Sequence, residues 1–272
     1  MASHPQRNDR SKAKYNPAGP RPGGGAPFRR GAGADPTAWV WGWHAVIAAL
    51  DNPDRPPPSR ILASPDRTEA LQARPDGSAL VIETVESGMI SQLLPGAAVH
   101  QGIALKIPPL EPVSLEDLAA PARGLLLMLD QVTDPQNVGA IFRSATAFGV
   151  RGVILQDRHA PALAGALAKA AAGAIDKIPH ARAVNLSRAL EQLEDLGWHT
   201  VGLDGGADAD LAEALTPAPT VLVMGAEGEG LRRLVAEHCD VLAKIHMPGG
   251  FESLNVSAAA AVALYEASRR RQ

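Results

Sequence analysis

Continuous apolar runs alternate with amphipathic segments through the second half of the chain. Such runs predict buried strands, because a strand in the middle of a covered parallel sheet contacts apolar groups on both faces. The predicted strands are residues 124–130, 152–156, 198–204, 220–225 and 241–247. Apolar residues at helical spacing lie between them and predict helices at residues 137–148, 162–173, 185–196, 230–238 and from about 255. The alternation predicts an α/β fold with a parallel sheet covered on both faces.

The first half of the chain has a weaker pattern, with a helix predicted near residues 44–51 and a strand at 60–64. Trp39, Trp41 and Trp43 alternate, which predicts a strand with one aromatic face that packs against the domain or stacks on bases. Proline, small residues and acids at 113–124 favour a linker. The predicted division is a basic tail at 1–35, a small α/β domain at 36–110, a linker at 111–121 and a larger domain at 122–272.

The composition is that of a soluble globular protein, with 46% hydrophobic and 20% charged residues. The alanine-rich runs are shorter than the roughly 20 apolar residues that span a bilayer, and the N-terminus has no apolar signal region. We therefore expect a cytoplasmic protein with no membrane partner. The single cysteine, Cys239, excludes an intrachain disulfide framework and a multi-cysteine zinc site, and we expect it to be a small buried residue.

Charge is unevenly distributed, although the whole chain carries only −3. Residues 1–35 contain seven Lys and Arg residues against two Asp residues, a net charge of +5. This segment has almost no large apolar side chains, so we expect it to be disordered. A basic arm of this kind adds salt-sensitive affinity for nucleic acid or only keeps the protein in solution, and the sequence leaves both open.

Ligands of parallel sheets bind at the carboxyl ends of the strands, so the loops that follow Asp130, Asp204, Gly225 and Met247 are the ones to inspect. After Asp130 the chain reads DPQNVGAIFRS, in which Asn137 can cap a helix and Arg143 projects two turns further on. This spacing is equally typical of a capped helix with a solvated arginine.

The second junction, GAEGEG at residues 225–230, follows a buried strand. Its glycines let the backbone approach a ligand closely, but it lacks the G-x-G-x-x-G spacing and the Lys-Ser/Thr pair of phosphate loops. Glu227 and Glu229 disfavour a phosphate there and favour a ligand with a positive centre or hydroxyl groups, for instance a sulfonium or a ribose. A tight turn with two solvated acids is the alternative.

The third junction, GGFESLNVS at 249–257, leads into the last predicted helix. Gly249 and Gly250 allow a tight path, and Ser253 or Asn255 can cap the helix. By itself this is an ordinary helix start. In a parallel sheet, however, all three junctions would meet at one edge.

The three junctions, in this order, resemble the three motifs of the SpoU-TrmH family of S-adenosylmethionine-dependent RNA 2′-O-ribose methyltransferases. The matching stretches are DPQNVGAIFRSATAFGV, VLVMGAEGEGLRR and IHMPGGFESLNVSAAAAVALYE. GWHAVIAAL at 42–50 resembles the opening of the family's L30e-like RNA-binding domain, and the resemblance spans residues 39–270. MGAEGEGLRRLVAEHCD is most similar to the branch that methylates a guanosine in 23S rRNA.

The resemblance implies a deep trefoil knot in the catalytic domain, a homodimer, an RNA substrate and no role for DNA or a metal ion. It implies that Gly225, Ile245 and Leu254 hold the donor's adenosine through backbone groups. The polar reaction site that it implies consists of Asn137, Arg143, Glu227, Ser253 and Asn255.

The resemblance leaves the roles of three residues open. The family proposal makes Arg143 the base, but a guanidinium rarely gives up its proton, and fixing a phosphate while stabilising alkoxide charge is an equally physical role. Glu227 could then orient Arg143 or the donor. Glu252 stands where many relatives carry an uncharged residue, so its contact with RNA stays open.

Three other functions compete with 23S rRNA methylation. The same chemistry on tRNA is the nearest, although relatives that act on tRNA often lack a whole N-terminal domain. A non-catalytic RNA-binding protein would not require all five polar residues. A nucleotide-dependent oxidoreductase is disfavoured because G-x-G-x-x-G is missing.

Overall fold

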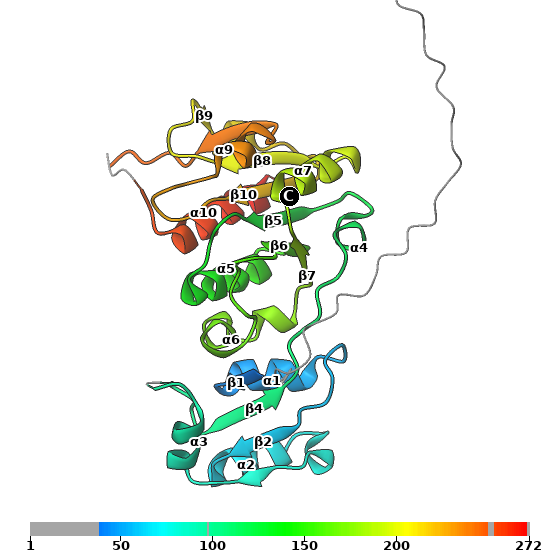
Figure 1. The fold of residues 1–272 in the computed structure, drawn as a ribbon, viewed down its shortest axis with the longest axis vertical. Helices are drawn as coiled ribbons and strands as arrows, with labels where there is room; N and C mark the ends of the chain where they lie inside the picture. Colours follow the sequence, from blue (N-terminus) through cyan, green and yellow to red (C-terminus); the bar gives the residue numbers. More distant parts are fainter. Residues whose placement is uncertain (1–37, 97, 250–252, 271–272) are drawn as a thin grey trace, which may run out of the picture. The chain divides into compact units, whose positions relative to one another are not determined.

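Two β-sheets organise residues 38–96, 98–249 and 253–270, the part of the chain that the computed structural model describes (Figure 1). The first is a four-stranded sheet in the order β1-β4-β2-β3. Its strands are β1 (Ala38–Trp41), β2 (Arg60–Ala63), β3 (Glu83–Thr84) and β4 (Ile103–Ile107). Strand β4 pairs antiparallel with β1 and β2, and β2 pairs parallel with β3.

Short helices accompany the four-stranded sheet: α1 (Trp43–Asp51), α2 (Pro65–Gln72), the 3₁₀ turn η1 (Gly77–Ala79) and α3 (Ser87–Leu93). The expectation of one aromatic strand face is wrong for Trp43, which is the first residue of α1. Gly42 ends the strand because its φ of 87° is a conformation that side-chain-bearing residues rarely adopt. Trp39 and Trp41 do share one apolar cluster.

The second sheet has seven parallel strands in the order β7-β6-β5-β10-β8-β11-β9. Its strands are β5 (Leu125–Leu129), β6 (Gly152–Gln156), β7 (His180–Ala183), β8 (His199–Leu203), β9 (Ala209–Asp210), β10 (Thr220–Met224) and β11 (Val241–Lys244). Every residue of β5 and of β10 is buried. The predicted α/β fold with a parallel sheet is confirmed.

Helices cover both faces of this sheet: α4 (Leu115–Ala119), α5 (Pro135–Ala147), α6 (Gly165–Ala171), η2 (Ala174–Asp176), α7 (Leu186–Asp195), α8 (Leu211–Ala214), α9 (Arg233–Glu237) and α10 (Val256–Arg269). Side chains of β5 alternate between two apolar clusters. Leu127 packs in the cluster that holds residues of α5, α6 and α10, while Met128 packs with those of α4, α7 and α9. The first cluster also includes residues of the four-stranded sheet, so one apolar core connects both sheets.

The stretch expected to be a linker, residues 111–121, is structured. Ser114 caps α4 by accepting a hydrogen bond from the backbone N–H of Asp117, and Leu118 is buried. The indole of Trp198 donates to the carbonyl of Ala119 at 2.9 Å, and Val113 forms a β-bridge with Ala181. The exact domain boundaries stay a prediction, but this segment packs against the seven-stranded sheet.

Several predicted elements are shorter than expected. Helix α9 begins at Arg233 because Gly230, with φ of 69°, still belongs to a turn, and β11 ends at Lys244. Strands β4 and β7 were not predicted. The knot stays a prediction, since residues 250–252, which lead into α10, lie outside the described residues, as do the basic tail, Gly250 and Glu252. Within the described residues no helix is long and apolar enough to cross a membrane.

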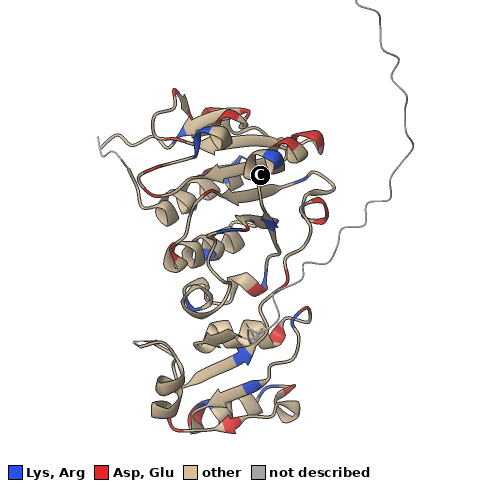
Figure 2. Cartoon of the chain, in the orientation of Figure 1, with Lys and Arg blue, Asp and Glu red and all other residues tan. Residues whose placement is uncertain are grey.

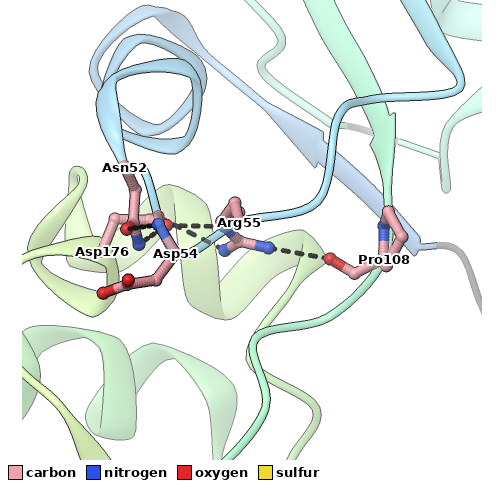
Figure 3. Close-up of polar contacts among 5 residues, drawn as sticks. All are labelled: Asn52, Asp54, Arg55, Pro108 and Asp176. Carbon is pink, nitrogen blue, oxygen red and sulfur yellow. Dashed lines mark hydrogen bonds and ion pairs between the residues drawn. The ribbon is translucent and has the colours of Figure 1, made fainter.

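A buried ion pair joins the turn after α1 to η2 (Figure 3). The Arg55 guanidinium donates from Nε to Oδ1 of Asp176 at 2.6 Å and from Nη2 to Oδ2 at 3.3 Å. Its Nη1 donates to the carbonyl of Pro108 at 3.0 Å, and Asn52 donates to Oδ1 of Asp176 at 3.1 Å. Both charged side chains are only 1% exposed. This pair therefore ties the end of β4 and the turn after α1 to the larger sheet's helical layer.

Candidate active site

A cavity of about 380 Å³ opens at the carboxyl ends of β8, β10 and β11 and at the start of α10. Its walls combine apolar side chains with exposed backbone of glycine-rich loops, and its residues fall within the stretches 203–206, 224–231, 243–247 and 253–259. This volume lies within the range of about 300–1,000 Å³ that is usual for small-molecule sites. The sheet edge predicted from the sequence is thus the one that is hollowed.

The three residues expected to hold the donor, Gly225, Ile245 and Leu254, all line this cavity. Gly225 is required by a close approach of the loop to itself: a Cβ there would lie 2.0 Å from the carbonyl carbon of Gly230. Ala226 and Gly230 exchange two backbone hydrogen bonds of 3.0 Å, which close the turn. The loop is therefore a compact turn, and all of its residues from Gly225 to Gly230 line the cavity.

Asp130 anchors this turn from the neighbouring strand. It follows β5, is completely buried, and donates its backbone N–H to Met224 at 2.8 Å. Its carboxylate accepts from the backbone N–H of Arg232 at 2.9 Å and from Arg232 Nε at 2.7 Å. The sequence pointed to the loop after Asp130 but not to this pair. A lone aspartate at the end of an apolar strand was the available signal, because a buried carboxylate requires partners.

Asn255 brings three predicted reaction residues together. Its amide Nδ2 donates to Oδ1 of Asn137 at 3.1 Å and to Oε2 of Glu227 at 3.3 Å. Its Oδ1 caps α10 by accepting from the backbone N–H of Ser257 at 2.9 Å. The residues come from the first turn of α5, the loop after β10 and the start of α10. One asparagine is therefore both a helix cap and the centre of a polar cluster at the cavity's edge.

Asn137 does not cap α5, as its position suggested it could. Asp134 accepts from the backbone N–H of Asn137 at 2.9 Å and is the cap, with Pro135 as the first helical residue. Proline at this position has no N–H to satisfy, so the helix begins two residues earlier than predicted. The amide side chain of Asn137 is consequently available for Asn255.

Ser253 and Arg143 lie outside the Asn255 cluster. Ser253 lines the cavity and is exposed. Arg143 is an exposed residue of α5, six residues beyond Asn137 and so about 9 Å further along the helix axis. Glu227 bonds Asn255, and no hydrogen bond joins it to Arg143 among the described residues. The structure thus groups four of the predicted polar residues at the cavity and its edge and leaves Arg143 apart.

Two further features bear on the chemistry. Burial raises the pKa of the Cys239 thiol to about 12, with Asp240 and Asp130 adding to the shift, and its Sγ donates to the carbonyl of Val235. The thiol is thus held in its neutral, unreactive form. Among the described residues, no three His, Cys, Asp or Glu side chains are grouped in a way that could hold a metal ion.

Two family models match the chain. The SpoU rRNA Methylase family matches residues 124–265, and the family described as RNA 2'-O ribose methyltransferase substrate binding matches residues 39–113. The chain belongs to the SpoU rRNA methylase family. It is therefore an RNA methyltransferase, and its methyl donor is S-adenosylmethionine.

Individual relatives agree with the family. A protein of Mycolicibacterium smegmatis, named an uncharacterized tRNA/rRNA methyltransferase, is 38% identical over 90% of this chain and 80% of its own length. The structure of the SpoU methyltransferase AviRb from Streptomyces viridochromogenes with AdoMet aligns with a TM-score of 0.73 at 25% identity, over 86% of this chain and 90% of that one. An AdoMet-bound rRNA methyltransferase from Sinorhizobium meliloti aligns with a TM-score of 0.73 at 26% identity, over 87% and 88%.

The cavity fits this donor in chemistry as well as in size. Apolar residues such as Met224 and Leu231 line the cavity and suit an adenine ring. Glu227 and Glu229 both line the cavity, and their carboxylates favour a positively charged sulfonium.

Proposed function

We propose that this methyltransferase modifies the 2′-oxygen of a guanosine ribose in 23S rRNA, using the residues around the donor cavity. The observation that carries the proposal is the contact of Asn255 with Asn137 and Glu227 at the edge of that cavity. Amide and carboxylate groups placed there can hydrogen-bond the hydroxyls of a ribose beside the donor's methyl group. We assign Gly225, Ile245 and Leu254 to the donor and the polar residues to the acceptor.

The reaction makes a bond from the ribose 2′-oxygen to the methyl carbon and breaks the bond from that carbon to sulfur. Bound S-adenosylmethionine supplies an electrophilic methyl group on a sulfonium centre. The chain's own residues then have two tasks: to align the oxygen with the methyl group, and to stabilise the negative charge that develops on the oxygen as its proton passes to water. Alignment alone is worth about 7–11 kcal/mol in well-oriented reactions.

Asn137, Asn255 and Ser253 fit the first task, because each offers uncharged hydrogen-bonding groups that can orient a ribose without repelling RNA. Arg143 fits the second: a guanidinium with pKa above 12 stays charged, so it binds a phosphate and stabilises alkoxide charge rather than accepting a proton. Arg143 lies apart from Asn137 and Asn255, and an acceptor RNA is long enough to contact both Arg143 and these two residues.

The choice of rRNA as substrate is supported by two features. The region around the four-stranded sheet, which matches the substrate-binding family, gives the chain a large surface besides the donor site. The GAEGEG loop and the residues after it resemble the 23S rRNA branch most. Nucleoside mass spectrometry of rRNA and tRNA from a deletion strain tests this, and one 2′-O-methylguanosine should be missing from 23S rRNA. Loss from tRNA instead would overturn the rRNA proposal and favour the tRNA alternative.

Arg143→Ala tests the residue roles. We expect loss of methyl transfer with the donor dissociation constant nearly unchanged, because Arg143 contacts the acceptor. Arg188→Ala is the matched control, since Arg188 is an exposed arginine of α7 on the opposite face of the sheet. An equal loss of donor affinity and rate would count against the assignment.

We further propose a homodimer that forms through α10 and completes the reaction site. Val262 and Tyr265 are exposed apolar positions on one side of α10, and the ring of Phe148 meets Tyr265 edge-on at 6.0 Å. Adjacent exposed apolar side chains suit an interface between copies. Light scattering should give twice the chain mass, and Val262→Glu should yield a monomer with little activity; an active monomer would exclude this role.

A further inference from the structure

Two cations from different parts of the fold meet at one glutamine. The side-chain carbonyl of Gln101, just before β4, accepts from Lys169 Nζ on α6 at 2.6 Å and from the backbone N–H of Trp43 at 3.0 Å. Its backbone carbonyl accepts from Arg67 Nε at 3.0 Å. Gln101 holds a φ of 57°, a left-handed conformation that is uncommon outside glycine. We call Trp43, Arg67, Gln101 and Lys169 the Gln101 cluster.

The cations of the Gln101 cluster are poorly neutralised. Among the described residues, the one acid in an ion pair with them is Asp66, 3.6 Å from Arg67 Nε, and its side chain is 74% exposed and accepts a hydrogen bond from Ser64. No carboxylate pairs with Lys169 among the described residues, and partial burial lowers the pKa of its ammonium group. An anion bound beside Lys169 would offset this effect of burial on its ammonium group, so this position favours a negatively charged ligand.

Other cations of the same region are paired with acids. Arg60 forms two hydrogen bonds with Glu83, at 2.7 and 2.8 Å, and Arg74 bonds both Asp51 and Asp76. Figure 2 shows Lys and Arg mixed with Asp and Glu along the chain, without one broad basic face in that view. Attraction of an anion therefore depends on local groups such as the Gln101 cluster.

Arg67 is also held in a definite orientation. Its guanidinium lies over the ring of Trp43, 5.0 Å from the ring centre, while Nε is fixed by Gln101. Its Nη groups make no hydrogen bond with described residues, so they remain available. A guanidinium fixed at one nitrogen and open at the other two suits a phosphate, which it can bind through two parallel hydrogen bonds.

The Gln101 cluster is connected to the reaction site through packed helices. Gly139 is two residues beyond Asn137 on α5, and a Cβ there would lie 2.6 Å from the Cβ of Ala170. Ala170 is the neighbour of Lys169 on α6. The helix that carries Asn137 thus packs directly on the helix that carries Lys169.

We propose that Arg67 and Lys169 together hold one backbone phosphate of the substrate RNA, outside the reacting nucleotide. The proposal rests on the proposed function for its ligand, an RNA strand, but adds a site that the donor cavity and the Asn255 cluster do not include. Such a contact carries no sequence information and positions the strand so that the 2′-hydroxyl enters the reaction site in register.

The test compares Arg67→Gln, Lys169→Gln and the double variant with Arg60→Gln, a control that removes a cation already neutralised by Glu83. The probe is transcribed 23S rRNA from the same organism, and the affinity of the full chain is measured from 50 to 200 mM salt. We expect the double variant to bind at least tenfold more weakly at 100 mM salt and to lower the slope of log K against log salt by about 1. Lys169→Arg should restore most of the affinity.

Two further measurements separate this site from its neighbours. Donor affinity, measured by calorimetry, should be unchanged in every variant, and the thermal midpoint should match that of Arg60→Gln. If the double variant binds 23S rRNA like the control, or if the unaltered protein fails to bind it, the phosphate site is wrong. If the variants behave as expected but the 2′-O-methylguanosine is missing from tRNA in the deletion strain, the phosphate site stands and the choice of substrate falls.

Discussion

Two polar junctions join the elements around the four-stranded sheet to the helices of the larger sheet, and they differ in charge balance. At the first, Arg55 and Asp176 neutralise each other in a bidentate pair that is almost completely buried (Figure 3). At the second, Arg67 and Lys169 converge on the neutral Gln101 with one exposed acid nearby. Both contacts span residues far apart in the sequence.

This difference in charge balance distinguishes a junction that joins two parts of the fold from one that can bind a ligand. Charges removed from water must be paired and hydrogen-bonded, and Arg55 and Asp176 satisfy that demand internally, so the pair has little left to offer a ligand. In the Gln101 cluster the cations Arg67 and Lys169 hydrogen-bond a neutral glutamine, so their positive charge is not balanced by that partner. We infer that the first junction fixes the relation of the two sheets and that the second uses this fixed relation to receive RNA.

The largest effect should come from breaking the buried pair. Arg55→Ala leaves the carboxylate of Asp176 buried without its cation, and we expect a loss of about 3–5 kcal/mol in the free energy of unfolding. Urea denaturation measures this, with Arg74→Ala as the control, because its acid partners are about half exposed and such pairs contribute about 0–1 kcal/mol.

A double substitution sharpens the same comparison. Arg55→Met with Asp176→Leu removes both charges, so more than half of the lost stability should return, since apolar replacement of a buried pair is often neutral. A loss of less than 1 kcal/mol in Arg55→Ala would show that the junction is not what holds these elements together.

The next effect concerns pH at the same junction. Burial lowers the pKa of His180 to about 4, and the charges of Arg182 and Arg55 contribute. The unfolded state binds this proton near pH 6.5, so the stability is present above that value and is lost as the pH falls from 6.5 towards 4, by about 3 kcal/mol in total.

Unfolding experiments across this range can isolate His180. His180→Gln should flatten the acid side of the stability profile between pH 6.5 and 4. A variant that keeps the full slope would assign it to other groups. Since Arg55 helps to depress this pKa, Arg55→Ala should make the pH-dependent loss of stability smaller and end it at a higher pH, whereas Arg67→Gln at the other junction should not.

The ion pair of Asp130 and Arg232 is intermediate in burial between the Arg55–Asp176 pair and the exposed pairs, because its carboxylate is fully buried and its arginine side chain is 43% exposed. Asp130→Asn keeps the shape of the side chain but removes the charge that holds Arg232, just beyond the loop that we propose binds the donor. We expect donor affinity to fall about tenfold, or 1.4 kcal/mol, as seen by calorimetry. Arg233→Ala, which breaks only an exposed pair with Glu237, is the control and should leave donor affinity unchanged.

The sequence predicts a feature well when the residues that form it are close together along the chain. The apolar runs of β5 and β10 identified buried strands because each strand is covered on both faces. The glycines at 225–230 and the residues Asn137 and Asn255 were found because each stands at a strand-to-helix junction, and the parallel sheet brings the junctions to one edge.

The remaining features have no local signal. Arg55 and Asp176 are 121 residues apart, and Asp130 and Arg232 are 102 apart, so nothing near either partner reveals the other. Local competition explains two errors in detail: Gly42 ends the strand before Trp43, and Asp134 with Pro135 takes the cap position from Asn137. Long-range charge pairs therefore needed the structure, whereas periodic and junction features did not.

The smallest effect separates charge from orientation at the Gln101 cluster. Trp43→Leu keeps both cations but removes the ring on which Arg67 rests, and a cation–π contact of this kind is worth about 0.5–1 kcal/mol at an exposed site. We expect the affinity for 23S rRNA to fall about two- to fivefold, while the salt slope stays that of the unaltered protein, because the number of neutralised phosphates is the same. Trp43→Phe should recover the affinity, since it restores an aromatic face. A slope that changes as much as in the double Arg67 and Lys169 variant would mean that Trp43 maintains the whole junction, and the distinction between a holding and a binding junction would then be lost.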